Sequence, residues 1–207
     1  MKAKHYVMVI DLQLCTGCNT CSVACKQENN LPEGVWWTQV ITVGSNGDES
    51  PQGSYPNLSL EYLPLACQHC VNGPCVDVCP SSATFRRDDG LVMQDPSLCI
   101  GCRYCMLVCP FTSVRVFAED EPHYVLPFPT GGNPLVHRGR TVEKCTFCAH
   151  RLAQGLQPAC VAVCPARART FGDLDDPESD VAKLLRTRPH FQLLAEKGTA
   201  PSVYYLT

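Results

Sequence analysis

Sixteen cysteines are the residues of this chain whose type and spacing could support chemistry. They form four sets of four, and no cysteine is left over. The sets are Cys15, Cys18, Cys21 and Cys25; Cys67, Cys70, Cys75 and Cys79; Cys99, Cys102, Cys105 and Cys109; and Cys145, Cys148, Cys160 and Cys164. Thiolates in this number and pattern are typical of proteins that bind soft metal ions or iron-sulfur clusters.

The spacing within the sets indicates cubane clusters. The first and third sets read C-x2-C-x2-C-x3-C, in which three cysteines of one loop bind one cluster and the fourth binds the neighbouring cluster. Sixteen thiolates therefore suit four [4Fe-4S] clusters. Pro80, Pro110 and Pro165 follow the last cysteine of three sets, and Lys26 is the exception. The fixed φ of proline turns the chain away after the ligand.

Disulfides and zinc are the competing explanations for so many cysteines. Dense disulfide frameworks belong mainly to small secreted domains, whereas this chain has 207 residues. We also expect no signal peptide, because Met1 to Lys4 leads directly into a short apolar run. A tetrahedral zinc site is complete with two C-x2-C pairs. The second set, C-x2-C-x4-C-x3-C, and the fourth set, C-x2-C-x11-C-x3-C, would each be ambiguous alone, and the fourth could pass for a zinc ribbon.

Other side chains near the cysteines could tune a bound cluster. His69 and His150 adjoin cysteines, but a Rieske centre with two histidine ligands would leave too many cysteines unused. We interpret both histidines as supporting or surface residues. Four cations close to cysteines in the sequence are expected to offset the negative charge of a cluster. These cations are Lys26, Arg103, Lys144 and Arg151.

The composition sets the limits on fold and partners. The hydrophobic fraction of 45% includes the cysteines, so the core is modest and we expect clusters to organise a loop-rich fold that is largely unfolded without metal. A net charge of −3 with dispersed basic residues gives no sign of nucleic-acid binding. No apolar run is long enough for a membrane-spanning helix, so we expect no direct membrane span.

The elements that must position the cysteines can be read from the intervening sequence. Residues 5–11 are predicted to form a strand and residues 20–28 a helix. A β-prone run around Trp36 to Val43 precedes an expected exposed loop over residues 44–55 and a strand over residues 58–63. A hairpin is predicted over residues 83–94, because Asp88, Asp89 and Gly90 separate two β-prone segments.

The second half of the chain alternates irregular and regular segments. Residues 111–144 are rich in proline and glycine and are predicted to be an irregular insertion. A helix is expected to begin at Asp176, with Pro177 in its first turn and an apolar face further on. Residues 203–206 are β-prone, and the end of the chain is interpreted either as a packing strap or as a docking surface.

The four sets are repeats of one unit, and two repeats make one two-cluster ferredoxin unit. Spacing alone does not decide which sets pair. The short gap between Cys79 and Cys99, bridged by the predicted hairpin, favours pairing the second set with the third, and the first with the fourth. The expected ligand groups are then Cys15, Cys18, Cys21 and Cys164; Cys25, Cys145, Cys148 and Cys160; Cys67, Cys70, Cys75 and Cys109; and Cys79, Cys99, Cys102 and Cys105.

The order of the sets, with x4 in the second and x11 in the fourth, resembles the iron-sulfur electron-transfer subunits of respiratory molybdoenzymes. These include dimethyl sulfoxide, polysulfide, thiosulfate, arsenate and nitrate reductases. The segments KCTFCAHRL at residues 144–152 and FGDLDDPES at residues 171–179 are similar to the polysulfide and arsenate reductase branch, as is the ending with Gly198, Thr199, Pro201 and Tyr205. Nitrate reductase relatives have tryptophan at the position of Cys102, so the cysteine here implies a fourth [4Fe-4S] cluster.

The resemblance implies the same pairing and an α+β, loop-rich fold of two interleaved bacterial ferredoxin-like units, each with short strands and helices and two [4Fe-4S] clusters. We expect a single compact unit over residues 1–207. Its expected parts are an inner half at about 58–118, an outer half at about 1–57 plus 140–175, the insertion at 111–144 and a C-terminal strap at 176–207.

The resemblance also implies a function. It indicates a non-catalytic subunit that passes electrons between a quinone-reactive membrane-anchor subunit and a molybdenum or tungsten pterin catalytic subunit. The cluster of Cys15, Cys18, Cys21 and Cys164 is expected toward the catalytic subunit, and the second and third sets toward the membrane. Export together with the catalytic subunit implies the periplasmic face of the bacterial inner membrane, with the cytoplasmic face as the alternative.

Two other functions remain open from the sequence. One is a free multi-cluster ferredoxin that shuttles electrons between soluble enzymes, and the other is a zinc-stabilised scaffold for protein interactions. No glycine-rich phosphate loop, nucleophile elbow or HExxH motif indicates catalysis on an organic substrate. The family resemblance implies polysulfide, thiosulfate, arsenate or a similar compound as the terminal substrate, and nothing in this chain encodes the choice among them.

Overall fold

A computed structural model describes residues 4–44, 50–119, 121–124, 128, 132 and 136–207. The strands are β1 (Tyr6–Asp11), β2 (Thr38–Thr42), β3 (Gln52–Ser54), β4 (Asn57–Ser59), β5 (Tyr62–Ala66), β6 (Thr84–Arg86), β7 (Val92–Gln94), β8 (Arg115–Ala118), β9 (Thr141–Lys144), β10 (Arg169–Asp173), β11 (His190–Phe191) and β12 (Val203–Leu206). The helices are α1 (Thr20–Glu28), α2 (Pro74–Asp77), α3 (Tyr104–Leu107), α4 (Ala149–Leu152), α5 (Ala159–Ala162), α6 (Asp180–Thr187) and the 3-10 helix η1 (Ala195–Lys197).

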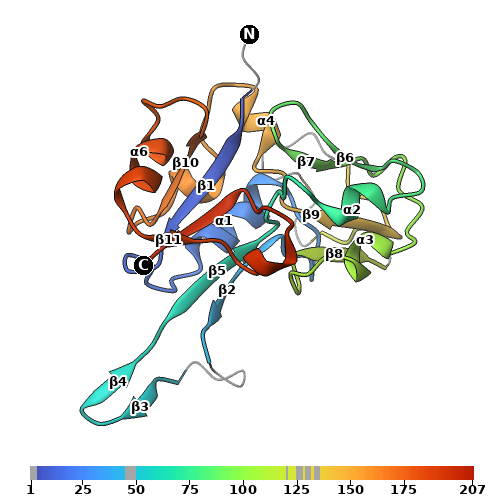
Figure 1. Ribbon diagram of the computed structural model, residues 1–207. Helices are drawn as coiled ribbons and strands as arrows, with labels where there is room; N and C mark the ends of the chain where they lie inside the picture. The colour runs from blue at the N-terminus through green and yellow to red at the C-terminus, as the bar shows by residue number, and fades with distance from the viewer. Residues whose placement is uncertain (1–3, 45–49, 120, 125–127, 129–131, 133–135) are drawn as a thin grey trace.

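A four-stranded sheet in the order β10-β1-β12-β11 supports one half of the molecule (Figure 1). Strand β1 pairs antiparallel with β10 and parallel with β12, so it is central and buried on both faces. Alternation along β1 directs Met8 and Ile10 to one face and Val7 and Val9 to the other. We call this sheet, together with α1, α4, α5 and α6, the sheet half.

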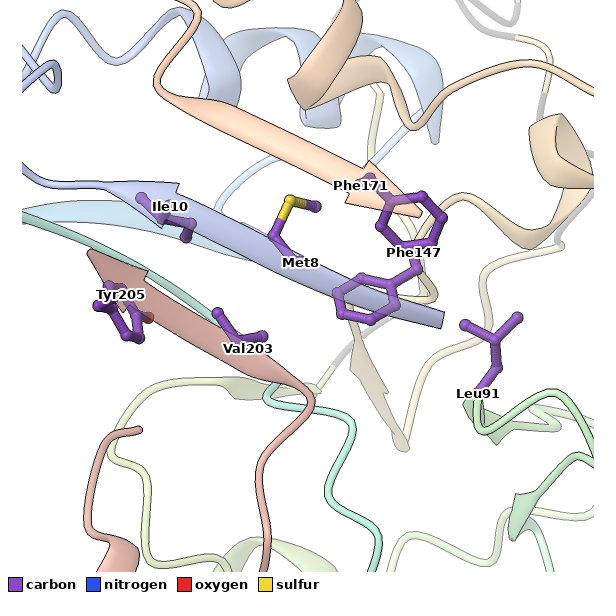
Figure 2. Packing of buried hydrophobic residues seen from close by; sticks show 7 residues of the cluster. All are labelled: Met8, Ile10, Leu91, Phe147, Phe171, Val203 and Tyr205. Carbon is purple, nitrogen blue, oxygen red and sulfur yellow. The ribbon is translucent and has the colours of Figure 1, made fainter. Parts of the chain in front are cut away.

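The main hydrophobic core lies on the Met8 and Ile10 face of the sheet (Figure 2). Figure 2 shows strands β1, β10 and β12 side by side, with Phe171, Val203 and Tyr205 pointing into the same core as the β1 residues. The buried members are Met8, Ile10, Leu91, Phe147, Phe171, Val203 and Tyr205. Leu91 lies beside the hairpin of β6 and β7, so this core also joins the two halves of the molecule.

Helix α6 covers the opposite face of the sheet, where Val181 packs against Val7 and Val9. The predicted apolar face of this helix is confirmed, but its predicted start at Asp176 is wrong. Ser179 is the N-cap, and its hydroxyl accepts a hydrogen bond from the Ala182 amide at 3.2 Å. Asp176 instead accepts from the Glu178 amide at 3.0 Å in the preceding turn. Both residue types can cap a helix, and the serine lies next to the residues that pack on the sheet.

The other half of the molecule is built from short elements, which we call the hairpin half: β6, β7, α2, α3, β8 and β9. Strands β6 and β7 form the predicted hairpin, and β8 pairs antiparallel with β9. In Figure 1 these elements lie to one side of the molecule, and β10, β1 and α6 lie to the other. The predicted strand over residues 5–11 and helix over 20–28 are also confirmed.

The expected irregular insertion at 111–144 is wrong at both ends. Residues Arg115–Ala118 form β8 and Thr141–Lys144 form β9, and the two strands pair in register over four residues. Phe117 and Val142 face each other across this ladder, a pairing that favours a sheet. The prolines and glycines that suggested irregular structure lie between the two strands. The pairing joins β9 to β8.

A two-stranded arm projects from the body in Figure 1, with β3 and β4 at its far end. Its base is the ladder of β2 and β5, and its end is the ladder of β3 and β4. The expected exposed loop over residues 44–55 therefore contains a strand at Gln52–Ser54, while 45–49 lie outside the described residues. The strand expected over 58–63 divides into β4 and β5.

The C-terminal segment is part of the central sheet. Strand β12 lies between β1 and β11, and Tyr205 and Leu206 are fully buried. The Tyr205 hydroxyl donates to the Pro64 carbonyl at 3.0 Å, which joins the sheet to the base of the arm. Of the helices among the described residues, none has the length and hydropathy needed to cross a membrane.

Candidate metal centres

The four cysteine sets share one backbone turn. In each set the residue before the second cysteine adopts a positive φ: 70° at Gly17, 45° at His69, 70° at Gly101 and 52° at Phe147. This left-handed region is uncommon for residues other than glycine. Its occurrence at the same position four times shows that each loop reverses direction between its first and second cysteines.

The third cysteine of every set lies in a helix that begins immediately before it. Cys21 is in α1, Cys75 in α2, Cys105 in α3 and Cys160 in α5. In the first and third sets, the two residues between the second and third cysteines connect the positive-φ turn to the start of the helix. The longer x4 and x11 spacings of the other two sets end at the same point, so they are insertions into one common unit.

Three of the four expected cysteine groups line cavities in the structure. We call the cavity lined by Cys15, Cys18, Cys21 and Cys164 site 1. Site 2 is lined by Cys25, Cys145, Cys148 and Cys160. Site 3 is lined by Cys67, Cys70, Cys75 and Cys109. In each case, cysteines from two sets far apart in the sequence face one space, so these sites depend on the tertiary structure.

The fourth group, which we call site 4, consists of Cys79, Cys99, Cys102 and Cys105. The pKa of the Cys105 thiol is raised by burial first, and the negative charges of Cys75, Cys99 and Cys79 raise it further. Cys105 is therefore near both sets of its expected group and near Cys75 of site 3. Sites 3 and 4 are neighbours in the hairpin half.

The thiol environments suit metal binding. Burial is the main cause that raises the pKa of Cys70 to about 12 and the pKa values of Cys109 and Cys148 to about 11. For Cys25, burial and the charges of the three other site 2 cysteines raise the pKa well above its ordinary value. Four thiolates crowded into a buried space repel one another, so they deprotonate together only around a cation. The donor set thus fits a cationic iron-sulfur core.

The cysteine groups are less suited to binding a single metal ion. Within the described ranges, no group of three or more His, Cys, Asp or Glu side chains is close enough together to hold one metal ion. All sixteen cysteines are free thiols in this structure. The four-cysteine groups surround spaces instead of converging on a point, as ligands of a multi-iron core must.

Several cysteine sulfurs accept hydrogen bonds from the protein. The backbone amides of Thr84, Phe147 and Ala168 donate to Cys79, Cys145 and Cys164 at 3.4, 3.4 and 3.3 Å. The Asn29 side-chain amide donates to the Cys25 sulfur at 3.6 Å. Hydrogen bonds to cluster sulfurs are one of the means by which a protein sets a reduction potential.

The four cations singled out in the sequence make other contacts. The Lys26 ammonium donates to the carbonyls of Pro32 and Val35 at 2.7 and 3.1 Å. Arg103 stacks on Phe117 at 3.6 Å. Among the contacts between described residues, neither cation donates a hydrogen bond to a cysteine sulfur.

Lys144 and Arg151 serve as structural links. Lys144 is fully buried and donates to the Val92 carbonyl of β7 and, at 2.9 Å, to the Cys145 carbonyl. It therefore joins the hairpin half to the fourth cysteine set. Arg151 forms an ion pair with Glu28 at 2.9 Å, and this carboxylate also contacts His150 at 2.8 Å.

His69 is also structural. Its ring is buried and stacks on Phe147 with centroids 3.8 Å apart, and its Nδ1 accepts a hydrogen bond from the Val92 amide at 3.1 Å. Burial, followed by the charge of Lys144, lowers the pKa of His69 well below its ordinary value. The interpretation of His69 and His150 as supporting residues agrees with these contacts.

Sequence reasoning missed a buried network around His137. Its Nδ1 lies 2.7 Å from a Glu143 oxygen and its Nε2 lies 2.8 Å from the Asn29 carbonyl. The Trp37 indole donates to the other Glu143 oxygen at 3.2 Å. Since Asn29 also donates to Cys25, the network supports site 2. No pattern in the sequence relates these separated residues.

Two buried arginines were missed as well. Arg169 donates to the Cys21 sulfur at 3.4 Å, and Arg115 lines the site 3 cavity. Each follows the fourth cysteine of a set, Cys164 or Cys109, and begins the next strand. A comparison of the segments after each set is the sequence signal that would have found them.

Only two cysteines are exposed, Cys18 and Cys102. Each is the second cysteine of a C-x2-C-x2-C-x3-C set, and each belongs to a different half of the molecule. The Cys18 thiol lies 3.3 Å from the Thr20 hydroxyl, and this hydrogen bond lowers the pKa of Cys18. Sites 1 and 4 are therefore the two that contain an exposed cysteine.

Comparisons with known proteins agree with the geometry. Two family models, each described as a 4Fe-4S dicluster domain, match residues 7–80 and residues 58–123 with 134–174. A Halobacterium salinarum protein named as an iron-sulfur subunit of dimethyl sulfoxide reductase is 51% identical over 98% of this chain and 79% of its own length. The arsenate respiratory reductase iron-sulfur subunit ArrB of Shewanella sp. ANA-3 is 40% identical over 96% of this chain and 94% of its own length. A selenate reductase subunit of Mesobacillus selenatarsenatis is 39% identical over 98% of this chain and 72% of its own length.

Proposed function

Because this chain belongs to the iron-sulfur beta subunits of respiratory molybdopterin oxidoreductases, we propose that it conducts electrons between a quinone-reactive membrane subunit and a molybdenum or tungsten pterin catalytic subunit. Two dicluster domains and sixteen cysteines account for four [4Fe-4S] clusters. A bound [4Fe-4S] cluster supplies a centre that accepts and returns one electron.

The observation that carries the proposal is the arrangement of the cysteines as four groups with only two exposed members. We propose that sites 1 to 4 each hold one cluster through the four cysteines that define them. Within the sheet half, Arg169 lines both the site 1 and site 2 cavities. Within the hairpin half, Cys105 of site 4 is near Cys75 of site 3. Neighbouring sites of this kind favour transfer from one centre to the next.

The contact between the halves supports a continuous path. The charge of Cys67, a site 3 residue, raises the pKa of Cys145, a site 2 residue, after the larger effects of burial and of the other site 2 cysteines. Sites 2 and 3 are therefore neighbours across the boundary between the halves. The proposed order is site 1, site 2, site 3 and site 4, with the exposed Cys18 and Cys102 at its ends.

The surface around Cys102 has features of a contact site for another protein. Around Cys102, apolar side chains are exposed at Ile100 (68%), Tyr104 (54%) and Leu107 (78%). Exposed apolar clusters of this kind are typical of interaction sites. We propose that this end contacts the membrane subunit and that the Cys18 end contacts the catalytic subunit. The family resemblance gives the same orientation.

We further propose that the complex acts at the periplasmic face of the bacterial inner membrane, to which this subunit is exported with its catalytic partner. The cytoplasmic face is the alternative. Protease treatment of intact cells whose outer membrane has been made permeable distinguishes the two. A subunit that resists digestion until the inner membrane is broken contradicts the periplasmic location.

Anaerobic purification of the native protein tests the function. We expect it to accompany a large pterin-containing subunit, to contain iron and acid-labile sulfide in equal amounts, and to give several reducible paramagnetic signals. Zinc without inorganic sulfide would indicate the scaffold function. A cluster-loaded monomer with no large companion would indicate a free ferredoxin. The metal and substrate of the companion subunit would identify the reductase class.

A further inference from the structure

Each half of the molecule contains one buried arginine whose neighbours are cysteines from both of its sites. In the sheet half this residue is Arg169, the first residue of β10, with 7% of its surface exposed. It lines both the site 1 and the site 2 cavities. Its Nη2 donates to the sulfur of Cys21 in site 1 at 3.4 Å.

The charge of Arg169 acts on both sites. Burial alone lowers the pKa of this guanidinium, but the negative charges of Cys160 and Cys21 outweigh burial and raise it. Cys160 belongs to site 2 and Cys21 to site 1. The arginine therefore lies between two groups of four thiolates and is attracted by both.

Arg115 has the corresponding position in the hairpin half. It is the first residue of β8, is 5% exposed and lines the site 3 cavity. The anions that raise its pKa against the effect of burial include Cys75 and Cys67 of site 3 and Cys105 of site 4. Arg115 lines the site 3 cavity together with Cys75, and Cys75 and Cys105 of site 4 belong to one buried cluster. Arg115 thus stands between sites 3 and 4, as Arg169 stands between sites 1 and 2.

Within the described ranges, neither arginine has a carboxylate to balance its charge. The ion pairs between described residues include neither Arg115 nor Arg169. Arg115 donates from Nη1 to the Gln94 side-chain oxygen at 3.4 Å, and its buried Nη2 has no hydrogen-bond partner in the described part of the chain. A buried guanidinium without an anion is costly. A negatively charged cluster in the adjacent site would remove that cost.

We propose that Arg169 and Arg115 each place one positive charge between the two clusters of a half, and thereby raise the reduction potentials of both clusters. This inference deepens the proposed function, because it rests on clusters in sites 1 to 4. Adding an electron to a cluster increases its negative charge, and a buried cation nearby favours that reduced state. It also weakens the repulsion between two neighbouring clusters that are both reduced. Solvent screens such a buried charge only slightly.

Redox titration of the full chain, prepared anaerobically with its clusters and monitored by electron paramagnetic resonance, tests the proposal. In Arg169→Gln, the reduced-to-oxidised ratio of two of the four clusters should fall about tenfold at a given potential. For a one-electron couple this corresponds to a reduction potential about 59 mV lower. The other two clusters should remain unchanged. Arg115→Gln should shift the complementary pair.

Arg167→Gln is the matched control for the sheet half. It removes the same charge two residues away from Arg169, but Arg167 is exposed to solvent. We expect its titration to match that of the wild type. Arg169→Lys and Arg115→Lys keep the charge while changing the hydrogen bonds. The reduced-to-oxidised ratio of each cluster in these variants should stay within about threefold of the wild-type ratio.

The outcomes separate this proposal from the function on which it rests. If the wild-type chain holds no iron and sulfide, the proposed function is wrong. If the wild type holds its clusters but Arg169→Gln shifts them no more than Arg167→Gln does, only the charge-balancing role is overturned. If the glutamine variants lose their clusters, the lysine variants are used to test whether charge sets the potentials. A lysine variant that keeps its clusters but shifts tenfold shows that hydrogen bonding, rather than charge, sets the potentials.

Discussion

The sheet half and the hairpin half each contain two cysteine sites, but the buried cores around these sites are made of different side chains. In the sheet half, sites 1 and 2 lie beside a core of aliphatic and aromatic side chains from three adjacent strands, and a second buried cluster contains one cysteine, Cys25, among its four members. In the hairpin half, the buried core consists of Cys75, Val92, Cys105 and Val142, so two of its four members are cysteines. A region whose core is partly made of cysteines depends on what those cysteines bind.

The difference shows that one repeated motif can be supported in two ways. Around sites 1 and 2, strands from both ends of the chain provide hydrophobic stability that is independent of metal. Around sites 3 and 4, two-stranded ladders are too small to be stable by themselves. The hairpin half should therefore gain more of its order from cluster binding than the sheet half does.

Removal of the clusters should have the largest effect and is the most direct test of this difference. After anaerobic chelation, amide hydrogen exchange should become fast throughout β6–β9 while β1 and β12 keep part of their protection, because the sheet has its own hydrophobic core. Exchange measured by mass spectrometry on the loaded and stripped protein would show this. Equal loss of protection in both halves would refute the distinction.

Truncation of the sheet core should produce the next largest effect. Tyr205→Ala should reduce the free energy of unfolding by about 3–5 kcal/mol, as for other buried aromatic residues. It also removes the hydroxyl that bonds to Pro64. Anaerobic guanidinium unfolding measures the change. Leu107→Ala in the hairpin half is the control, since this side chain is 78% exposed and should change stability by no more than about 0.5 kcal/mol.

Equivalent glycines before the second cysteine allow the halves to be compared at one position. Gly101→Ala and Gly17→Ala both impose a positive φ of 70° on alanine, which costs about 1–3 kcal/mol. A Cβ at Gly101 would also overlap the Arg140 backbone carbonyl, whereas at Gly17 it would overlap the Tyr62 ring. A side chain can move more easily than the backbone. We therefore expect Gly101→Ala to lower the temperature of cluster loss more than Gly17→Ala. The reverse order would show that the Arg140 backbone moves more easily than the Tyr62 ring.

The His137 network should give the smallest effect, one that depends on pH. Burial lowers the pKa of His137, but its hydrogen bond to Glu143 and the charge of that carboxylate outweigh burial and raise it. Protonated His137 therefore stabilises the fold fully below the unfolded value of about 6.5, and this contribution is lost as pH rises through the folded pKa. The loss of thermal stability caused by His137→Gln should shrink over that range. A difference that is constant with pH would show that His137 is neutral.

Much of the local structure was predictable because it depends on near neighbours in the chain. The strand at β1, helix α1 and the hairpin of β6 and β7 follow from alternation, spacing and an Asp-Gly turn. Errors occurred where composition was used in place of pairing. Proline and glycine between β8 and β9 concealed two strands that pair with each other, and the polar sequence around β3 concealed the arm.

The sequence by itself determined the number of thiolates, their division into four sets and the type of cofactor, because these depend on residue identity and short spacing. Only the tertiary structure decided which sets face one cavity, that β12 lies in the centre of the sheet, and that Arg115 and Arg169 stand between sites. The physical reason is distance along the chain. Contacts between residues separated by more than a hundred positions, such as Cys21 and Arg169, arise from packing of the whole molecule, and the local sequence does not specify which partners meet.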